Sequence, residues 1–369
     1  MAEHQNKYIH ALRTLPGIGN GTLTLLLAHF GDGEKAWQAS PEEISSVPGL
    51  LPGKKSLLIT ERKVVDPEKL WEKLSALGIT LHTKEDPTYP KLLREIPDCP
   101  STLYTRGSYH FDKSAPTIAI VGSRKYSPYG EQAAYKLAQD LTHAGWVVVS
   151  GMAFGIDSHA HRGALEAGGE TLAVLGSGID DPMISPVSHF SLAKRIMTRG
   201  ALISEYPPGT QASRGSFPMR DRIIAGLCLG TIVIEAPAKS GSLITANCAL
   251  DYNREVFAVP GSIFSPYSIG TNALIKKGAK IVTGVQDILE EFIAEFPMPT
   301  LTDTSTDASS LGLLPDENKL LAVLTHEPLH IDKIIKLTTL ATREVSSLLT
   351  VLEIKGLVKN SGGMYYVRM

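Results

Sequence analysis

The sequence has few of the features that would assign it to a metal-binding, secreted or membrane class. Its 369 residues include only three cysteines, Cys99, Cys228 and Cys248, and their spacing matches no metal motif. It has no run of about 18 uncharged apolar residues, so no membrane-spanning helix is expected. The first fifteen residues, MAEHQNKYIHALRTL, lack the basic segment and apolar core of a secretory signal. These absences predict a cytoplasmic protein.

An excess of charge of either sign is also missing. Lys and Arg total 36, Asp and Glu total 38, and the net charge is -2. This balance argues against a highly basic polyanion binder and against an acidic tail, so any nucleic-acid site must be a local patch. The length predicts two or three domains, and the 43% hydrophobic content is that of an ordinary soluble protein.

Residues 1–75 have the pattern of a helical domain. The sequence LPGIG at 15–19 precedes an apolar helix, and a looser copy, VPGL at 47–50, precedes another. Each copy is similar to a helix-hairpin-helix turn, whose glycine amides can contact a DNA phosphate without reading the base sequence. A helical connector, in which the glycines only permit a tight turn, explains the same pattern. Both interpretations stay open.

Residues 76–296 alternate between short apolar runs and amphipathic helical windows. The runs have no polar alternation, as expected of parallel strands buried on both faces. In the window 128–143, Ser127 and Pro128 are suited to the N-cap and first helical positions. The pattern predicts an α/β fold with an extended Rossmann-like, doubly wound, mostly parallel sheet. The candidate strands are residues 117–122, 146–150, 171–175, 201–204, 231–235, 255–259 and 280–283.

The C-terminal part predicts a linker and a further small domain. Residues 297–312 are rich in Pro, Ser, Thr and Asp, as in a flexible linker. Residues 313–369 give three helical windows, near 316–325, 330–338 and 342–355, and then a hairpin, which together make a winged-helix domain. This domain has seven Lys or Arg against six Asp or Glu, whereas a typical DNA reader carries more positive charge. A protein contact or weak binding of duplex DNA is therefore favoured over sequence-specific repression.

Several predicted strands end in glycine-bearing turns with polar or charged side chains. In an open parallel sheet these turns all lie at the carboxyl ends of the strands and line one crevice. The first is Gly122-Ser123-Arg124, where the absence of Gly-x-Gly-x-x-Gly disfavours a dinucleotide cofactor. The Ser123 hydroxyl and the Arg124 guanidinium suit an anion. Alternatively, Arg124 pairs with an acidic neighbour on the surface.

The turn at 150–157, SGMAFGID, carries Gly151 and Gly155, which are expected to shape the floor of the ligand site. Asp157 is interpreted as an N-cap, because Asp is among the preferred capping residues. His159 and His161 lie two residues apart, point away from each other on a helix and do not complete a zinc site. His159 could still meet a phosphate.

Two later segments add positive charge to the predicted crevice. Phe217 with Arg220 and Arg222 offers charge for a backbone and a ring for a base, as in single-strand binders. A core position for Phe217 is the alternative. Lys239-Ser240-Gly241-Ser242 brings small and hydroxyl residues to a helix N-terminus, which can hold an anion. A capped helix with an exposed lysine would explain Ser242 but not the whole cluster.

Six short motifs occur in order in this part of the chain. They are AIVGSR (119–124), SGMAFGID (150–157), SEYPPG (204–209), RIIAGL (222–227), SGSLITA (240–246) and VFAVPGS (256–262). Together they resemble the DNA-processing protein A family of bacteria (DprA, also called Smf) over about residues 85–296. The order of six motifs argues against a chance match. The helical and winged-helix segments look like the variable accessory domains of that family.

The resemblance implies a single-stranded DNA-binding protein that protects incoming DNA during natural transformation and helps to load the RecA recombinase. It implies a homodimer formed through the Rossmann-like domain, without enzyme activity, cofactor or metal ion. Phosphates would sit on helix N-termini and basic side chains, with little preference for base sequence. Carried over position by position, the DNA pocket would contain Gly122, Ser123, Arg124, Gly151, Gly155, Phe217, Arg220, Arg222, Lys239, Ser240, Gly241 and Ser242.

The chain departs from the family pattern at three places. Phe154 stands where the family often has Arg, Asp221 where it usually has Asn, and residues 179–183, IDDPM, lack the usual Tyr-Pro. An acid beside Arg220 and Arg222 would weaken phosphate affinity unless it orients those arginines.

Two other functions stay open on the sequence. Related Rossmann-like proteins act on nucleotide monophosphates as phosphoribohydrolases, and Glu235 after an apolar strand could serve as their acid. Residues 236–240, APAKS, do not supply the Gly-Gly-x-Gly-Thr type of loop and the paired acid which that chemistry needs. A transcription regulator that uses the winged helix has the least support.

Overall fold

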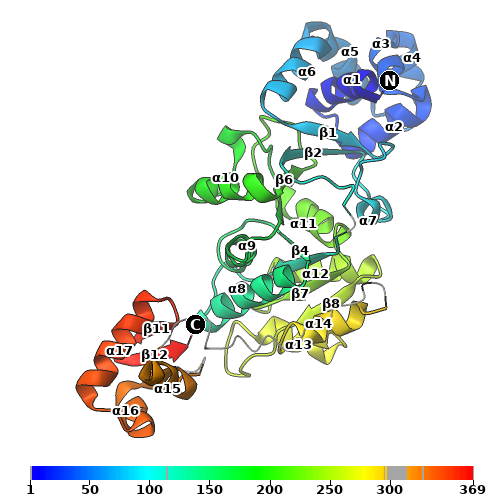
Figure 1. Ribbon diagram of the computed structural model, residues 1–369. Coiled ribbons are helices and arrows are strands. Elements are labelled where there is room, and N and C mark those ends of the chain that lie inside the picture. Colours follow the sequence, from blue (N-terminus) through cyan, green and yellow to red (C-terminus); the bar gives the residue numbers. More distant parts are fainter. Residues whose placement is uncertain (1, 114, 295, 297–313, 326–327, 369) are drawn as a thin grey trace. The chain divides into compact units, whose positions relative to one another are not determined.

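The computed structural model describes residues 2–113, 115–294, 296, 314–325 and 328–368. It divides into two compact units, Met1–Met298 and Pro299–Met369 (Figure 1). The predicted linker, 297–312, lies outside the described residues. Within the described part of the chain, no helix has the length and apolar character needed to cross a membrane.

The first unit begins with helices, as the sequence predicts. Ser40 and Glu43 form a capping box at one helix start, and Asp66 caps another by accepting from the backbone N–H groups of Glu68 and Lys69. Gly17 and Gly49 have φ of +77° and +73°, which glycine adopts without strain. The helices are α1 (Ala2–Thr14), α2 (Asn20–Phe30), α3 (Gly33–Gln38), α4 (Pro41–Ser46), α5 (Pro52–Glu61) and α6 (Pro67–Ala76).

A nine-stranded sheet follows, in the order β1-β2-β6-β5-β4-β3-β7-β8-β9. The strands from β6 to β9 in this order are parallel, whereas β2 pairs antiparallel with both β1 and β6. The predicted doubly wound, mostly parallel sheet is confirmed. The strands are β1 (Thr80–Thr83), β2 (Thr102–Gly107), β3 (Thr117–Val121), β4 (Val147–Ser150), β5 (Thr171–Val174), β6 (Ala201–Ser204), β7 (Gly230–Val233), β8 (Glu255–Ala258) and β9 (Lys280–Ile281).

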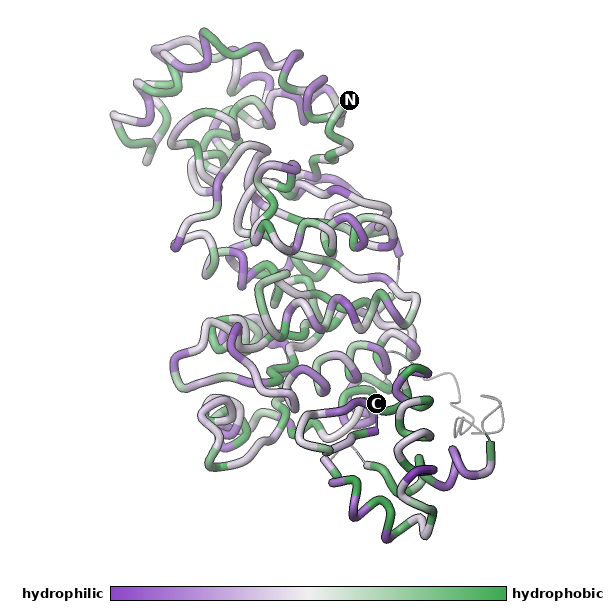
Figure 2. Tube along the Cα trace, turned by 90° about the vertical axis from the view of Figure 1, so that its left-hand side faces the viewer, coloured by the Kyte–Doolittle hydropathy of each residue, from purple (hydrophilic) through white to green (hydrophobic). Residues whose placement is uncertain are grey.

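Helices cover both faces of this sheet. Along β3, Ile118 belongs to a core cluster with α8 and α9, while Ala119 belongs to a second cluster with α11 and α12. Figure 2 shows hydrophilic and hydrophobic residues alternating along the helices, as expected when one helix face packs on a core. The helices after the first six are α7 (Lys91–Arg94), α8 (Pro128–His143), α9 (Ile156–Glu166), α10 (Phe190–Arg199), α11 (Ser216–Gly226), α12 (Ser242–Asp251), α13 (Ile269–Lys276) and α14 (Gln286–Leu289).

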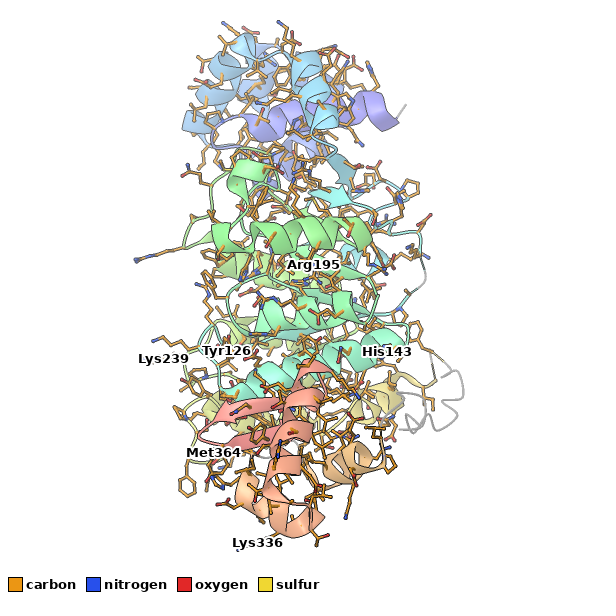
Figure 3. All side chains as sticks on the ribbon, turned by 60° about the vertical axis from the view of Figure 1, so that its left-hand side comes forward. Tyr126, His143, Arg195, Lys239, Lys336 and Met364 are labelled. Atoms are coloured by element: carbon orange, nitrogen blue, oxygen red, sulfur yellow. The ribbon has the colours of Figure 1, made fainter. Side chains whose placement is uncertain are left out.

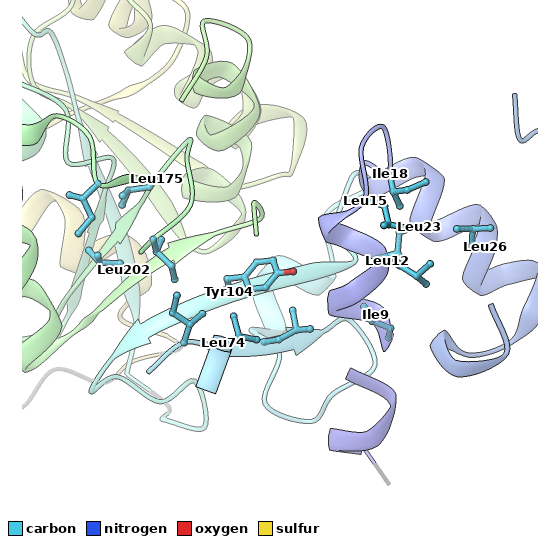
Figure 4. Packing of buried hydrophobic residues seen from close by; sticks show 14 of the residues in the cluster. Ile9, Leu12, Leu15, Ile18, Leu23, Leu26, Leu74, Tyr104, Leu175 and Leu202 are labelled. Atoms are coloured by element: carbon cyan, nitrogen blue, oxygen red, sulfur yellow. The ribbon is translucent and has the colours of Figure 1, made fainter. Parts of the chain in front are cut away.

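The N-terminal helices pack directly on the β1–β2–β6 end of the sheet. Tyr104 of β2 is fully buried, and its hydroxyl lies 3.0 Å from Nδ1 of His10 in α1. Arg13 of α1 donates to the backbone oxygen of Glu205, just after β6, at 2.7 Å. In Figure 4, Tyr104 lies between leucines of the sheet and apolar side chains of the first helices. One hydrophobic cluster therefore joins the two parts of this unit.

The second unit is a winged helix, which confirms the prediction from the C-terminal pattern. Three helices pack around buried leucines and Ile334, and three short strands form a small antiparallel sheet. Lys355 donates to the buried carboxylate of Glu317 at 2.7 Å. Its elements are α15 (Pro315–Val323), β10 (Leu329–His330), α16 (Ile331–Thr338), α17 (Thr342–Ile354), β11 (Val358–Gly362) and β12 (Tyr365–Arg368).

Candidate nucleic-acid interface

The sheet reverses its winding direction at β3, whose neighbours are β4 on one side and β7 on the other. Ligands of doubly wound folds bind outside the carboxyl ends of the strands at such a switch point. A cavity of about 450 Å³ lies there. It is lined mainly by the turns that follow β3 and β7 and by the start of α11. The predicted crevice therefore has a physical counterpart.

Positive charge dominates the lining of this cavity. Arg124, Lys125, Arg214, Arg220 and Lys239 line it, against the acidic Asp157 and Asp221. Arg124, Lys125, Arg214 and Lys239 are exposed. None of these four side chains forms an ion pair with a residue that the structure describes. In Figure 3, Lys239 extends outward from the edge of the sheet domain. These charges are available to an anionic ligand.

Arg124 lies over an aromatic ring rather than beside an acidic partner. Its guanidinium carbon is 5.1 Å from the centroid of the Phe217 ring, within the range of a cation–π contact. Phe217 is half-buried and lines the cavity. The neighbouring Ser123 is buried, and its hydroxyl accepts from the backbone N–H of Lys125 at 3.1 Å. Thus Ser123 shapes the turn, while Arg124 and Phe217 form a flat, charged surface.

Of the two helices that follow the β3 and β7 turns, α8 is already neutralised at its N-terminus, whereas α12 is not. At the start of α8, the Glu235 carboxylate accepts from the backbone N–H and the hydroxyl of Ser127, at 2.9 and 2.6 Å. At the start of α12, Gly241 is the N-cap, with no side-chain cap and no acidic residue in the first turn. The positive end of α12 therefore faces the cavity beside Lys239 and Ser240.

Glu235 does not line this cavity, because its side chain is buried under the start of α8. A catalytic acid must reach its substrate. The position of Glu235 thus gives no support to the phosphoribohydrolase hypothesis. The cap at Ser127, in contrast, is confirmed, with its hydroxyl accepting from the N–H of Gly130 at 3.2 Å.

The predicted glycines let the β3 and β4 turns pack closely together. A Cβ on Gly151 would lie 1.5 Å from Nη1 of Arg220, and a Cβ on Gly122 would lie 2.6 Å from Ile156. Gly155 has φ of +81°, and a Cβ there would lie 2.5 Å from the Ser123 oxygen. Gly122 also lines the main cavity, and Gly151 lines a smaller adjoining one of about 100 Å³. Gly155 lines neither.

The expected N-cap role of Asp157 is wrong. Helix α9 begins at Ile156, and Gly155 precedes it as the N-cap. Asp157 is buried, and its carboxylate accepts from the backbone N–H of Ala153 at 3.3 Å. Burial raises the pKa of this carboxyl group, against the opposing charge of Arg220. Asp157 therefore stabilises the β4 turn from within, and its buried carboxyl group lies at the cavity wall.

The two arginines of α11 face different environments. Arg220 is buried at the cavity wall, where its Nε lies 2.9 Å from Asp221 and its Nη1 donates to the Val174 oxygen at 3.1 Å. Arg222 lines neither cavity. Its Nη2 lies 2.5 Å from the buried Glu205 carboxylate. Residues two apart on a helix point to different sides, so the structure does not bring Arg222 into the predicted pocket.

Several residues of the cavity were not singled out as site residues on the sequence. Lys125 directly follows the predicted turn, and Arg214 precedes α11. A basic residue near the start of a predicted helix is the sequence feature that could have identified both as site residues. Tyr267 comes from the segment between β8 and α13, and no charge pattern marks it.

His159, which the sequence left as a possible phosphate contact, lies outside the cavity. Its Nδ1 is 3.7 Å from Oε1 of Glu131, and its ring centroid is 4.8 Å from that of Tyr126.

No group of three or more His, Cys, Asp or Glu suited to a metal ion occurs among the residues that the structure describes.

Phe154, at the first departure from the family pattern, is half-exposed beside His189, with the ring centroids 5.0 Å apart. It lines the smaller cavity with Gly151 and Arg220. An aromatic ring thus adds an apolar surface to the smaller cavity.

The position and pKa of Asp221 predict that anion binding at this cavity depends on pH. Burial raises the pKa of Asp221 to about 6, against the opposing charge of Arg220, and Asp157 adds to the rise. As pH falls through 6, the carboxylate gains a proton and stops repelling phosphates. We expect oligonucleotide affinity to rise as pH falls from 7.5 to 5.5.

Asp221→Asn removes this charge at every pH and keeps the side-chain size. At pH 7.5 we expect it to tighten binding of an oligonucleotide by about 3- to 10-fold, the effect of one charge at partly screened distance. It should also flatten the pH profile between 5.5 and 7.5. Fluorescence anisotropy titrations of both proteins measure this difference. Parallel pH profiles for the variant and the original chain would contradict the assignment.

Family comparisons agree with the fold. A model of the family described as DNA recombination-mediator protein A matches residues 80–293, and a model of the DprA winged helix domain matches residues 304–364. The chain is 35% identical over 401 aligned residues to the protein Smf of Synechocystis sp., and the match covers 100% of both chains.

Two solved structures are similar as well. That of DNA processing protein A from Streptococcus pneumoniae has a TM-score of 0.66 and 35% identity, and the match covers 79% of this chain and 98% of that one. The other is DNA processing protein A from Helicobacter pylori, whose reported structure concerns its mode of binding single-stranded DNA. It has a TM-score of 0.51 and 29% identity, with 59% of this chain and 98% of that one covered.

Proposed function

Because the chain belongs to the DNA recombination-mediator protein A family, we propose that it binds single-stranded DNA in the cavity at the β3–β7 switch point. The observation that carries this proposal is the convergence of four exposed cations that form no ion pair with a residue in the described part of the chain. Arg124, Lys125, Arg214 and Lys239 come from three separate segments of the chain and line one cavity. Such a local patch supplies the affinity for phosphates that the net charge of -2 does not.

The chemistry of the cavity favours the DNA backbone over particular bases. The start of α12 presents its positive end, and Lys239 adds a full charge next to it. Arg124 on Phe217 offers both a charge for a phosphate and an aromatic surface for an unstacked base. Neither contact distinguishes one base from another, so little sequence preference is expected. Binding of this kind requires no bond cleavage.

We further propose the cellular role that family membership suggests. The protein protects incoming single-stranded DNA and assists loading of the RecA recombinase during natural transformation and recombination, acting in the cytoplasm as a homodimer. The similarity to the Smf and DNA processing A proteins supports this role. Among the twelve residues proposed for the DNA site, Arg222 and Gly155 line neither cavity and act through the fold rather than by contact, and Gly151 lines only the smaller adjoining cavity.

A direct binding experiment tests the proposal. A labelled single-stranded oligonucleotide and a blunt duplex of the same length are titrated with the full chain at two salt concentrations. We expect the single strand to bind at least tenfold more tightly than the duplex. Its logarithmic salt slope should be about -2 to -3, as for three or four phosphate contacts to a single strand. Equal affinity for the two DNAs, or binding that salt leaves unchanged, would refute the proposal.

A further inference from the structure

The segment between β8 and α13, residues 259–268, holds two large apolar side chains in solvent. Phe264 is 90% exposed and Ile263 is 81% exposed. Of the large apolar side chains in the described part of the chain, Phe264 is the most exposed. Exposing an aromatic ring to water is unfavourable compared with burying it. Two such side chains next to each other form a small apolar surface that a ligand could cover.

This exposure is fixed by the fold of the loop. The side chain of Asn272 bonds both backbone groups of Gly261, accepting at 3.3 Å and donating at 3.0 Å. The Ser262 oxygen accepts from the N–H of Ser265 at 3.0 Å, and the Ser262 hydroxyl accepts from the N–H of Phe264 at 3.3 Å. The loop is thus held by its own hydrogen bonds in a shape that points its tip away from the core.

The loop lies at the same edge of the sheet as the cavity. Strand β8 is parallel to β7 and adjacent to it, so the segments that follow the two strands leave from one edge, about 5 Å apart. Tyr267 of the loop lines the cavity, and its backbone oxygen accepts from the N–H of Ala236 at 2.7 Å. Tyr129 of α8 donates to the Pro260 oxygen at 3.0 Å. The loop is therefore bound to the segment that follows β7 and to the first turn of α8.

We propose that Phe264, with Ile263 beside it, is a stacking platform for nucleobases of the strand whose phosphates occupy the cavity. This inference rests on the proposed function and adds to it a second contact, made to bases instead of phosphates. A strand that runs along the carboxyl edge of the sheet from β3 to β7 reaches β8 next. There it meets an aromatic face, on which any base can stack.

The size and surroundings of the platform favour a base over a protein partner. A stable protein interface covers about 800 Å² on each side, whereas this tip presents two adjacent apolar side chains flanked by Ser262 and Ser265. One exposed ring matches the area of one or two bases. The cavity beside it already offers the charge that holds the backbone of the same strand.

Phe264→Ala tests the proposal in the full-length chain. We expect the affinity for an oligo(dT) strand to fall by about 5- to 100-fold, the usual effect of removing one stacking ring. With an oligonucleotide of equal length whose sugars carry no bases, Phe264→Ala should bind like the original chain. Leu250→Ala is the matched control, because Leu250 is 58% exposed at the far end of α12 and should change neither titration.

Phe264→Trp gives a second readout that a structural role would not produce. The three native tryptophans are buried or half-buried, so a new exposed indole can be followed against them. Oligo(dT) should quench the added fluorescence and bind at least as tightly as to the original chain.

The outcomes separate this inference from the proposed function. If oligo(dT) binds Phe264→Ala and the original chain equally, the platform is refuted while binding in the cavity stands. An equal loss on the base-free strand, or a changed oligomeric state with unchanged DNA affinity, also refutes it, the latter in favour of a protein contact. If the original chain binds no single strand at all, the proposed function fails first.

Discussion

Replacing Arg124 and Lys239 together by alanine is expected to lower the affinity for a single-stranded oligonucleotide by about 100-fold, since each charged hydrogen bond is worth roughly 1.5 kcal/mol or more. Both side chains are exposed, line the cavity and form no ion pair with a described residue. Their removal should leave the fold intact. Two lost phosphate contacts should also reduce the logarithmic salt slope by about 1.4.

Anisotropy titrations at several salt concentrations measure both quantities. Arg195→Ala is the control, because Arg195 is exposed on α10, outside the cavity, and is labelled in Figure 3. It removes a positive charge from the same domain and should change affinity by less than about twofold, as a distant and screened charge. Equal losses in the double variant and in Arg195→Ala would mean that charge acts diffusely and that the cavity is not the binding site.

Arg222→Ala should have the opposite effects: a large loss of folding stability and little direct change in the affinity for DNA. The Arg222 guanidinium lies 2.5 Å from Glu205 and donates to the Asp98 oxygen at 2.7 Å. Alanine would leave the Glu205 carboxylate buried and unpaired, which costs about 3–5 kcal/mol of unfolding free energy. Burial already raises the pKa of Glu205 against the charges of Arg222 and Arg13. The unfolding midpoint in urea should fall clearly.

A second variant identifies the cause of that loss. Arg222→Met combined with Glu205→Gln removes both charges and keeps apolar volume, so it should recover most of the lost stability. The concentration of folded, binding-competent double variant is first determined by titration with oligonucleotide. Its affinity for the oligonucleotide should then lie within about twofold of that of the original chain, since distant sites act independently. A stable Arg222→Ala with greatly weakened DNA binding would instead place Arg222 at the ligand.

The parallel part of the sheet could be predicted because its strands are buried on both faces. The run at 117–122 became β3 (Thr117–Val121), and 201–204 became β6 with the same bounds. Strands β1 and β2 were missed. They contain threonines and other polar residues, and they pair antiparallel at the end of the sheet, so they lack the continuous apolar run that marks a central strand.

The candidate site was predictable where topology alone determines position. The turns after β3 and β7 had to meet at the switch point, and the structure places Arg124 and Lys239 at one cavity. Which side of a helix each residue faces was harder to predict. Arg220 and Arg222 were grouped because they are near in sequence, yet only Arg220 reaches the cavity wall. The loop with Phe264 carries no positive charge and was not recognised as part of the site.

The close contact between Gly151 and Arg220 limits how this family member can vary. Nothing larger than a hydrogen atom fits between the β4 turn and the guanidinium, because an added carbon would lie 1.5 Å from Nη1. A substitution at position 151 would therefore act as a second substitution at position 220, displacing a charge from the wall of the cavity. The two positions, far apart along the chain, are therefore sterically coupled, and a side chain at position 151 requires a different placement of the side chain at position 220.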